Sequence, residues 1–143
     1  MQKVRISLWE LSCYNEEKKR RPKDIESLVI NMKQERMYYC PVDAVLGVIG
    51  GKYKPIILYH LIDQTLRFSE LRRYLPQATP KMLTQQLREL EADGIIHREI
   101  YPVVPPKTEY SLTEFGRTIT PVLTAMCDWG KEYMSDKIRQ DSV

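Results

Sequence analysis

Hydrophobic residues between positions 40 and 94 recur with the 3.6-residue period of an α-helix in four short stretches. Each stretch has its own boundary residues, with proline or a hydroxyl side chain at its start and glycine, aspartate or proline at its end. The expected helices begin at Pro41, near Pro55, after the N-cap Ser69 and after the N-cap Thr79. They end at Gly50-Gly51, near Asp63, at Pro76 and at about Asp93, before Gly94.

The third and fourth expected helices are separated by a turn of about four residues, which predicts a helix-turn-helix. Three leucines of the fourth helix, Leu83, Leu87 and Leu90, fall within about 60° of one another and form its core face. The opposite face carries side chains that can bind base edges or phosphates. These are Lys81, Thr84, Gln85 and Arg88. An ordinary solvated helix face is the alternative interpretation.

A hairpin is predicted directly after this helix. The β-branched and aromatic stretch Ile95–Tyr101 predicts one strand, and Thr108–Leu112 predicts its partner. The stretch between them, Val103–Pro106, contains two prolines and is expected to protrude as a loop. Helix-turn-helix followed by a hairpin is the winged-helix arrangement. In that arrangement Arg98 and Lys107 are the expected phosphate contacts of the wing.

A last helix is expected after the N-cap Thr113. Pro121 lies inside its pattern and should kink or restart it, with Thr120 as a fresh cap. An apolar stripe follows the helix, and it favours either intrachain core or a dimer interface. We expect a dimer, because winged-helix proteins commonly bind paired half-sites. The stripe consists of Ile119, Val122, Leu123, Met126, Trp129 and Tyr133.

The first 36 residues predict a partly flexible arm. A charged run around Glu16 to Asp24 is typical of a solvated segment. A short amphipathic helix pattern follows at Ile25, Leu28, Val29 and Met32, of which Ile25 and Leu28 are expected at the dimer interface. The expected domain then spans residues 37–136, and residues 137–143 form a tail.

Composition and charge narrow the function. The 143 residues suit one domain with one core. There is no signal peptide and no apolar run that would cross a bilayer, so we expect a cytoplasmic protein without membrane contact. The net charge is +3, and the stretch from Lys52 to Lys107 carries +3 while the stretch from Thr108 to Val143 carries −2. The first 36 residues also carry +3, so positive charge lies in the arm and in the stretch with the predicted helix-turn-helix and wing, whereas the C-terminal part is acidic. This asymmetry allows a nucleic-acid surface.

An enzyme, a metal site and a cofactor are not expected. His60 and His97 have no neighbouring acid or nucleophile in a catalytic pattern, and His60 should be a packed side chain. Gly50-Gly51 is a helix break and not a phosphate loop. Cys13, Cys40 and Cys127 are odd in number and lack a CxxC spacing, so neither a disulfide framework nor a zinc site is expected.

Four stretches together resemble the HxlR-type winged-helix transcriptional regulators of bacteria. They are YYCPVDAVLGVIGGKYKPIILYHL, LRFSELRRYLP, KMLTQQLRELEADGIIHREIYP and VPPKTEYSLTEFG. The resemblance implies a mainly helical, dimeric fold with a small β-hairpin wing, in a MarR-like arrangement. It implies sequence-specific binding to a pseudo-palindromic double-stranded DNA operator, with Arg67, Ser69 and Arg72 as further DNA contacts. Tyr53 stands where the family usually has tryptophan.

The resemblance also implies a sensor at Cys40, because redox-responding members carry a cysteine just before this proline. Cys40 precedes a helix N-terminus, where partial positive charge favours a thiolate. The expected protein is then a repressor that responds to oxidants or electrophiles, whereas Cys127 is expected to be a small core residue. Two alternatives stay open, a winged-helix module that binds protein and a regulator that responds to a small molecule without thiol chemistry. The sequence does not indicate the inducer.

Overall fold

The computed structural model describes residues 36–139, which belong to the second of the chain's two units, Glu35–Val143. The helix and interface predictions for Ile25 and Leu28 lie outside these residues. The arm, and the domain boundaries placed at residues 36/37 and 136/137, remain predictions.

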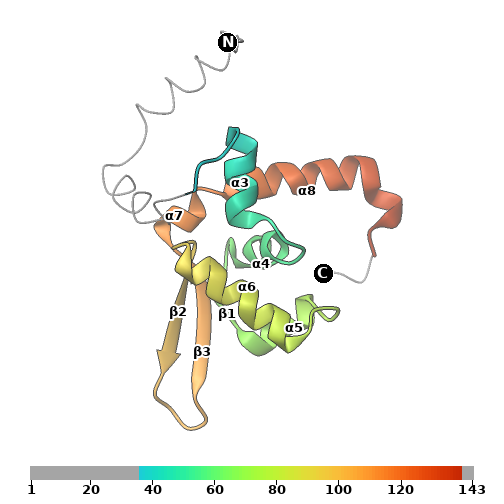
Figure 1. The fold of residues 1–143 in the computed structure, drawn as a ribbon. Helices are drawn as coiled ribbons and strands as arrows, with labels where there is room; N and C mark the ends of the chain where they lie inside the picture. The colour runs from blue at the N-terminus through green and yellow to red at the C-terminus, as the bar shows by residue number, and fades with distance from the viewer. Residues whose placement is uncertain (1–35, 140–143) are drawn as a thin grey trace. The chain divides into compact units, whose positions relative to one another are not determined.

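Short helices and a small sheet alternate along the described chain (Figure 1). In chain order the elements are α3 (Pro41–Ile49), α4 (Lys54–Leu61), β1 (Leu66–Arg67), α5 (Phe68–Tyr74), α6 (Pro80–Ala92), β2 (Ile96–Tyr101), β3 (Lys107–Leu112), α7 (Glu114–Arg117) and α8 (Thr120–Met134), followed by a 3-10 turn at Ser135–Lys137. The strands form an antiparallel sheet in the order β1-β3-β2. The predicted winged helix-turn-helix, mainly helical with a β-hairpin wing, is confirmed.

The core lies where α4, α5 and α6 meet the base of the sheet. Leu83, Leu87 and Leu90 are almost fully buried, which confirms the predicted core face of α6. Tyr53 is also buried, and its hydroxyl donates a hydrogen bond to the Gln77 carbonyl oxygen at 3.3 Å. This hydrogen bond ties the turn between α5 and α6 to the start of α4.

Two predicted caps are wrong. Helix α5 begins at Phe68 with Arg67 at the cap position, because the Glu70 carboxylate accepts the Arg67 backbone N–H at 2.7 Å. Ser69 therefore lies in the first turn. The chain restarts around Pro121 as predicted, but Ile119 occupies the cap position of α8 and no side chain caps it. The prediction that Thr79 caps α6 is confirmed, because its hydroxyl oxygen accepts the Met82 N–H.

Helix α6, strand β2 and helix α7 are joined at one corner. Gly94, with a φ of +69°, ends α6 in a Schellman turn, in which the Ile95 N–H donates to the Leu90 carbonyl. The Thr113 hydroxyl donates to the Gly94 carbonyl at 2.6 Å and accepts the Gly116 N–H at 2.9 Å. One side chain therefore links the end of α6 to the beginning of α7, and we call these contacts the Thr113 joint.

Gly116 has no room for a side chain at this joint. A β-carbon there would lie 1.9 Å from the Ile95 carbonyl oxygen, which is backbone. We expect Gly116→Ala to lower the free energy of unfolding by about 1–3 kcal/mol through overpacking. Urea titration followed by circular dichroism measures this. The matched control is Gly130→Ala in α8, where a β-carbon meets nothing within 4 Å and helix propensity favours alanine. Equal effects of the two variants would contradict the steric argument.

Candidate nucleic-acid interface

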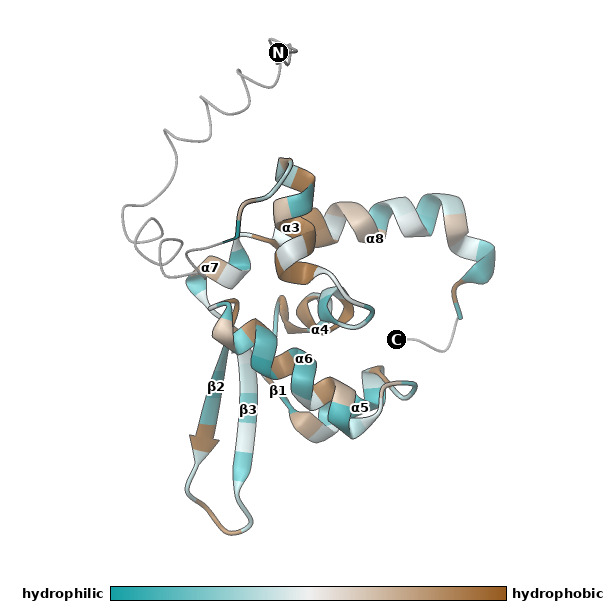
Figure 2. Cartoon of the chain, in the orientation of Figure 1, coloured by the Kyte–Doolittle hydropathy of each residue, from teal (hydrophilic) through white to brown (hydrophobic). Residues whose placement is uncertain are grey.

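Helix α6 presents a polar face outward and lies between α5 and the base of the hairpin (Figures 1 and 2). Lys81, Gln85 and Arg88 are exposed along it, and Thr84 is half-buried. They lie opposite the buried leucines because apolar and polar residues alternate with the helical period. These side chains are of the types that bind bases and phosphates in a DNA major groove.

The β2–β3 hairpin extends away from the helices as a wing (Figure 1). Its strands pair from Ile96 opposite Leu112 to Tyr101 opposite Lys107. The connecting residues 102–106 are exposed, and they contain a cis peptide bond between Val104 and Pro105. The structure therefore places the proline-rich segment at the tip, as the sequence predicts.

Three of the predicted basic DNA contacts form ion pairs within the chain. Glu109 on β3 lies between two of them, with its carboxylate 2.5 Å from Lys107 Nζ and 3.7 Å from Arg67 Nε. Arg98 pairs with Glu91 of α6 at 3.2 Å. The hydrogen bond from Lys107 is the main cause that lowers the pKa of Glu109, so this carboxylate stays charged at neutral pH. A phosphate would have to compete with these carboxylates.

The other candidate DNA contacts lie on α5 and α6. Arg72 and Ser69 are exposed on α5, and within residues 36–139 no ion pair involves Arg72, Lys81 or Arg88. Burial raises the pKa of the Tyr110 hydroxyl on β3, and the nearby guanidinium charges of Arg98 and Arg88 oppose that rise. Arg88 is therefore close enough to β3 for its charge to act there, beside the base of the wing.

Glu109 is expected to weaken nonspecific DNA binding. We expect Glu109→Gln to free Lys107 and Arg67 for phosphate, which strengthens binding to all duplexes and makes the salt dependence of log Kd steeper by about one. Fluorescence anisotropy over a series of KCl concentrations measures this slope. Glu99→Gln is the control, because Glu99 lies on the same hairpin but pairs with His97. An unchanged slope in Glu109→Gln would show that its two cations do not meet phosphate.

Cys40 occupies the N-cap of α3. Its Sγ accepts a hydrogen bond from the Asp43 N–H at 3.4 Å, and the residue is exposed. The Asp43 carboxylate in turn accepts the Tyr39 N–H at 3.0 Å. Helix α3 carries an exposed apolar side chain in its first turn, Val42, and another one turn later, Leu46. The candidate sensor thiol is therefore accessible, and it stands at the end of an apolar helix face.

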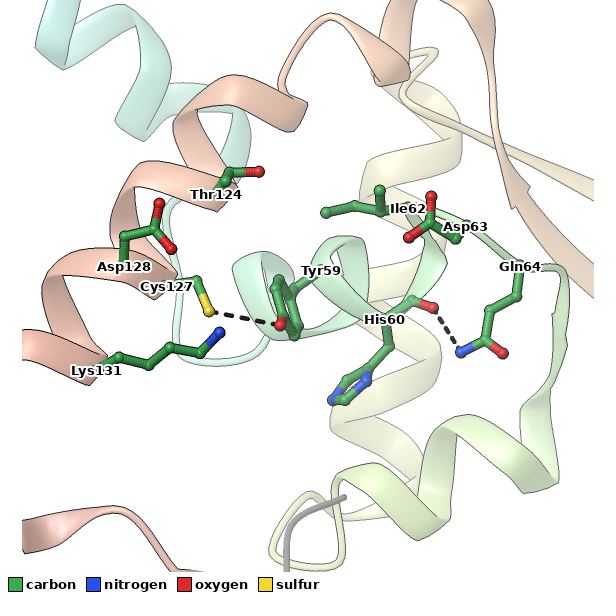
Figure 3. Close-up of a pocket in the computed structure, with 9 residues that line it drawn as sticks. All are labelled: Tyr59, His60, Ile62, Asp63, Gln64, Thr124, Cys127, Asp128 and Lys131. Carbon is green, nitrogen blue, oxygen red and sulfur yellow. Dashed lines mark hydrogen bonds between the residues drawn. The ribbon is translucent and has the colours of Figure 1, made fainter. Parts of the chain in front are cut away.

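Cys127 is not a core residue, contrary to the prediction. It is half-buried and lines a cavity of about 360 Å³ between α4 and α8, and its thiol donates a hydrogen bond to the Tyr59 hydroxyl at 3.4 Å (Figure 3). Lys131, one turn further along α8, points toward the same sulfur (Figure 3). Hydrogen bonding and charge interaction with Cys127 raise the pKa of both Tyr59 and Lys131. The cavity walls also carry Asp63 and Asp128.

Most of the predicted interface stripe on α8 is exposed. Trp129 is 60% exposed, and Val122, Met126 and Tyr133 are exposed on the same side, whereas Ile119 is half-buried. A groove lined by Pro121, Val122, Ala125, Met126 and Trp129 runs along the helix. Leu123 is only 3% exposed, because it packs into the chain's own core. It therefore does not belong to the exposed stripe.

Each histidine has a partner within the chain, and His97 on β2 meets the Glu99 carboxylate at 2.8 Å. His60 stacks on Tyr74 with ring centroids 4.0 Å apart, and burial lowers its pKa, so it is a neutral, packed side chain. No group of three potential metal ligands occurs among the described residues. Within residues 36–139, no helix has the length and apolarity of a membrane span.

Besides the ion pairs above, two contacts between helices were missed in the sequence. Lys54 is buried in the core and pairs with Glu89 of α6, and Tyr59 meets Cys127 across 68 positions of sequence. All four residues lie at ordinary helix positions, so no local sequence pattern indicates that they pair.

The comparisons with known proteins agree on one family. The model of the HxlR-like helix-turn-helix family matches residues 48–138, which is more than half of the chain. The uncharacterized HTH-type transcriptional regulator YdeP of Bacillus subtilis is 63% identical over 94 residues, which cover 66% of this chain and 73% of YdeP. YybR of the same organism, with the same description, is 62% identical over 92 residues, or 64% of this chain and 74% of YybR.

Solved structures match the fold as well. The oxidized form of the redox regulator HypR is 61% identical, with a TM-score of 0.63, over 65% of this chain and 96% of that one. A MarR-family transcriptional regulator from Porphyromonas gingivalis is 33% identical, with a TM-score of 0.65, over 68% and 96% of the two chains. The MarR-like arrangement is thereby confirmed. The chain belongs to the HxlR-like helix-turn-helix family, and it is a transcriptional regulator and not an enzyme.

Proposed function

We propose that the protein is a dimeric repressor that binds a pseudo-palindromic operator in the cytoplasm and releases it when Cys40 reacts with an oxidant or electrophile. The observation that carries the DNA-binding part is the exposed face of Lys81, Gln85 and Arg88 on α6, directly beside a protruding wing. A helix with such a face fits the major groove, and a hairpin next to it reaches flanking phosphates.

The exposed face of α8 supports a dimer. Val122, Met126, Trp129 and Tyr133 are spaced so that they share one side of the helix, and all four are exposed in the single chain. An exposed apolar stripe of this kind marks an interaction surface. A second copy of the chain is the proposed occupant, because a twofold dimer places two α6 helices on two half-sites.

Three observations support Cys40 as the sensor. Its thiol is exposed, it stands at a helix N-terminus, and it accepts an N–H from the first turn of α3. An exposed thiol is accessible to oxidants and electrophiles, and its nucleophilic form is the thiolate. HypR is described as a redox regulator, and YodB of Bacillus subtilis, a transcriptional regulator with 32% identity and a TM-score of 0.57, has a solved reduced form and a diamide-treated form.

The cavity between α4 and α8 supports a second candidate function. At about 360 Å³ it has the size of a small-molecule site. Its lining combines Lys131 with Asp63 and Asp128, so a polar ligand would find both charge signs there (Figure 3). In this alternative the regulator responds to a bound small molecule and Cys40 has no sensory role.

A footprint of the intergenic region next to the protein's own gene tests the proposal. The reduced protein should protect two half-sites about one DNA turn apart, roughly 34 Å. Sedimentation at micromolar concentration should show two chains, and protection should weaken steeply with salt but resist competitor DNA. Binding by a monomer, or equal binding to random duplexes, would contradict the proposal. Release on addition of a quinone by the wild type but not by Cys40→Ser supports the thiol sensor over the small-molecule alternative.

A further inference from the structure

We propose that Lys54, through Glu89, fixes the amide of Gln85 so that this side chain selects adenine over guanine. The inference rests on the proposed function, because it assumes that α6 contacts base edges. It adds a positioning residue in the protein core that determines base preference without touching DNA.

The buried position of Lys54 is unfavourable for the stability of the fold. It is the first residue of α4 and is only 5% exposed, yet it carries an ammonium group. Removing an ammonium from water is unfavourable, and a buried ion pair is often no more stable than an apolar replacement of similar volume. Its Nζ lies 2.8 Å from Glu89 Oε2, on the recognition helix. The contact therefore fixes one particular oxygen of one particular side chain.

The second oxygen of Glu89 holds Gln85. Glu89 Oε1 accepts a hydrogen bond from Gln85 Nε2 at 3.0 Å, one turn earlier on α6. The direction of this bond is set by chemistry, because a carboxylate has no hydrogen to donate and only the nitrogen of an amide can supply one. The chain of contacts thus runs from the core, through Lys54 and Glu89, to an exposed side chain of the predicted DNA-binding face.

This arrangement changes what Gln85 can present to a base. An amide nitrogen has two hydrogens, and Glu89 takes one of them. Gln85 then keeps one donor and its carbonyl acceptor. Adenine offers N7 as an acceptor and N6 as a donor in the major groove, which matches that pair. Guanine offers two acceptors, N7 and O6, so it cannot use the carbonyl and would need the hydrogen that Glu89 holds.

The test is selection from a duplex library in which each half-site is randomised. The position that Gln85 contacts is the one where Gln85→Ala loses its preference. There the wild type should prefer adenine over guanine on the order of tenfold or more, and Lys54→Met should reduce that ratio close to one. Lys54→Arg keeps the ion pair and should restore the preference. Preferences elsewhere and the salt slope should be unchanged.

The double variant Lys54→Met, Glu89→Ala is the second test, because it removes both charges together and leaves no ammonium buried without its partner. It should lose the same adenine preference. Glu91→Gln is the matched control, since Glu91 pairs with Arg98 and should leave this position unaffected. Equal weakening on all duplexes with an unchanged ratio would reduce Lys54 to a structural residue and overturn the inference alone. A wild type without any base preference would overturn the proposed function as well.

Discussion

Replacing Arg88 with alanine is expected to weaken binding to the operator by about 1–3 kcal/mol and to remove the base preference at one position of each half-site. Arg88 is exposed on the outer face of α6, and no ion pair within residues 36–139 occupies its guanidinium. A free guanidinium on a recognition helix can donate two hydrogen bonds to guanine, and that geometry distinguishes bases. Competition titrations with single-base operator variants measure the loss.

Lys107→Ala is the matched comparison for Arg88→Ala. Lys107 lies at the start of β3 beside the wing tip, and we propose that it contacts phosphate. Its removal should weaken all duplexes alike and reduce the salt slope by about one or less, because Glu109 already holds part of its charge. If the two variants behave identically on operator and random DNA, the division between base recognition by α6 and phosphate contact by the wing is wrong.

Treatment with a quinone is expected to release the wild-type protein from its operator, with an affinity loss of about 5- to 150-fold. The Cys40 thiolate adds to a ring carbon, the ring takes up the electron pair, and protons from water complete a hydroquinone thioether. The adduct adds bulk at the atom that accepts the Asp43 N–H and beside the exposed apolar residues of α3. A small rotation of one subunit then spoils the spacing of the two half-sites.

Cys40→Ser is well suited to this test, because serine is a good N-cap and preserves the hydrogen bond to Asp43 without a nucleophilic thiol. It should bind DNA like the wild type and hold it after quinone treatment in a gel-shift titration. Cys127→Ser is the control and should still release. A Cys40→Ser protein that responds as fully as the wild type, with Cys127→Ser unresponsive, would move the sensor to the cavity between α4 and α8.

The helices were predictable because their signals are local. The spacing of Leu83, Leu87 and Leu90 defined the buried face of α6, and Thr79 and Gly94 defined its ends. The Ser69 cap failed although the signal that overrides it is equally local. Serine has the right propensity, but the carboxylate of Glu70 reaches back to the Arg67 N–H and starts the helix earlier. A reciprocal pair of residues can override the preference of a single one.

The exposed polar residues of the interface were predictable, but their partners were not. The periodicity of α6 exposes Arg88 and Gln85, yet nothing in the sequence brings Glu109 between Arg67 and Lys107. Such pairs depend on strand register and on the packing of α6 against the sheet. The same holds for Lys54, which sequence statistics place at the surface and tertiary structure places in the core.

The Thr113 joint has a mechanical consequence. Its hydroxyl binds the carbonyl at the end of α6 and the amide that opens α7, and α8 begins only three residues after α7 ends. We therefore expect a rotation of α8 to move α6 and the wing together as one rigid unit. A chemical reaction or a bound ligand at α3 or α8 then needs only to change the angle of this rigid unit. Under the proposed function, the residues on α3 or α8 that respond to a signal are therefore separate from the residues on α6 and the wing that contact DNA.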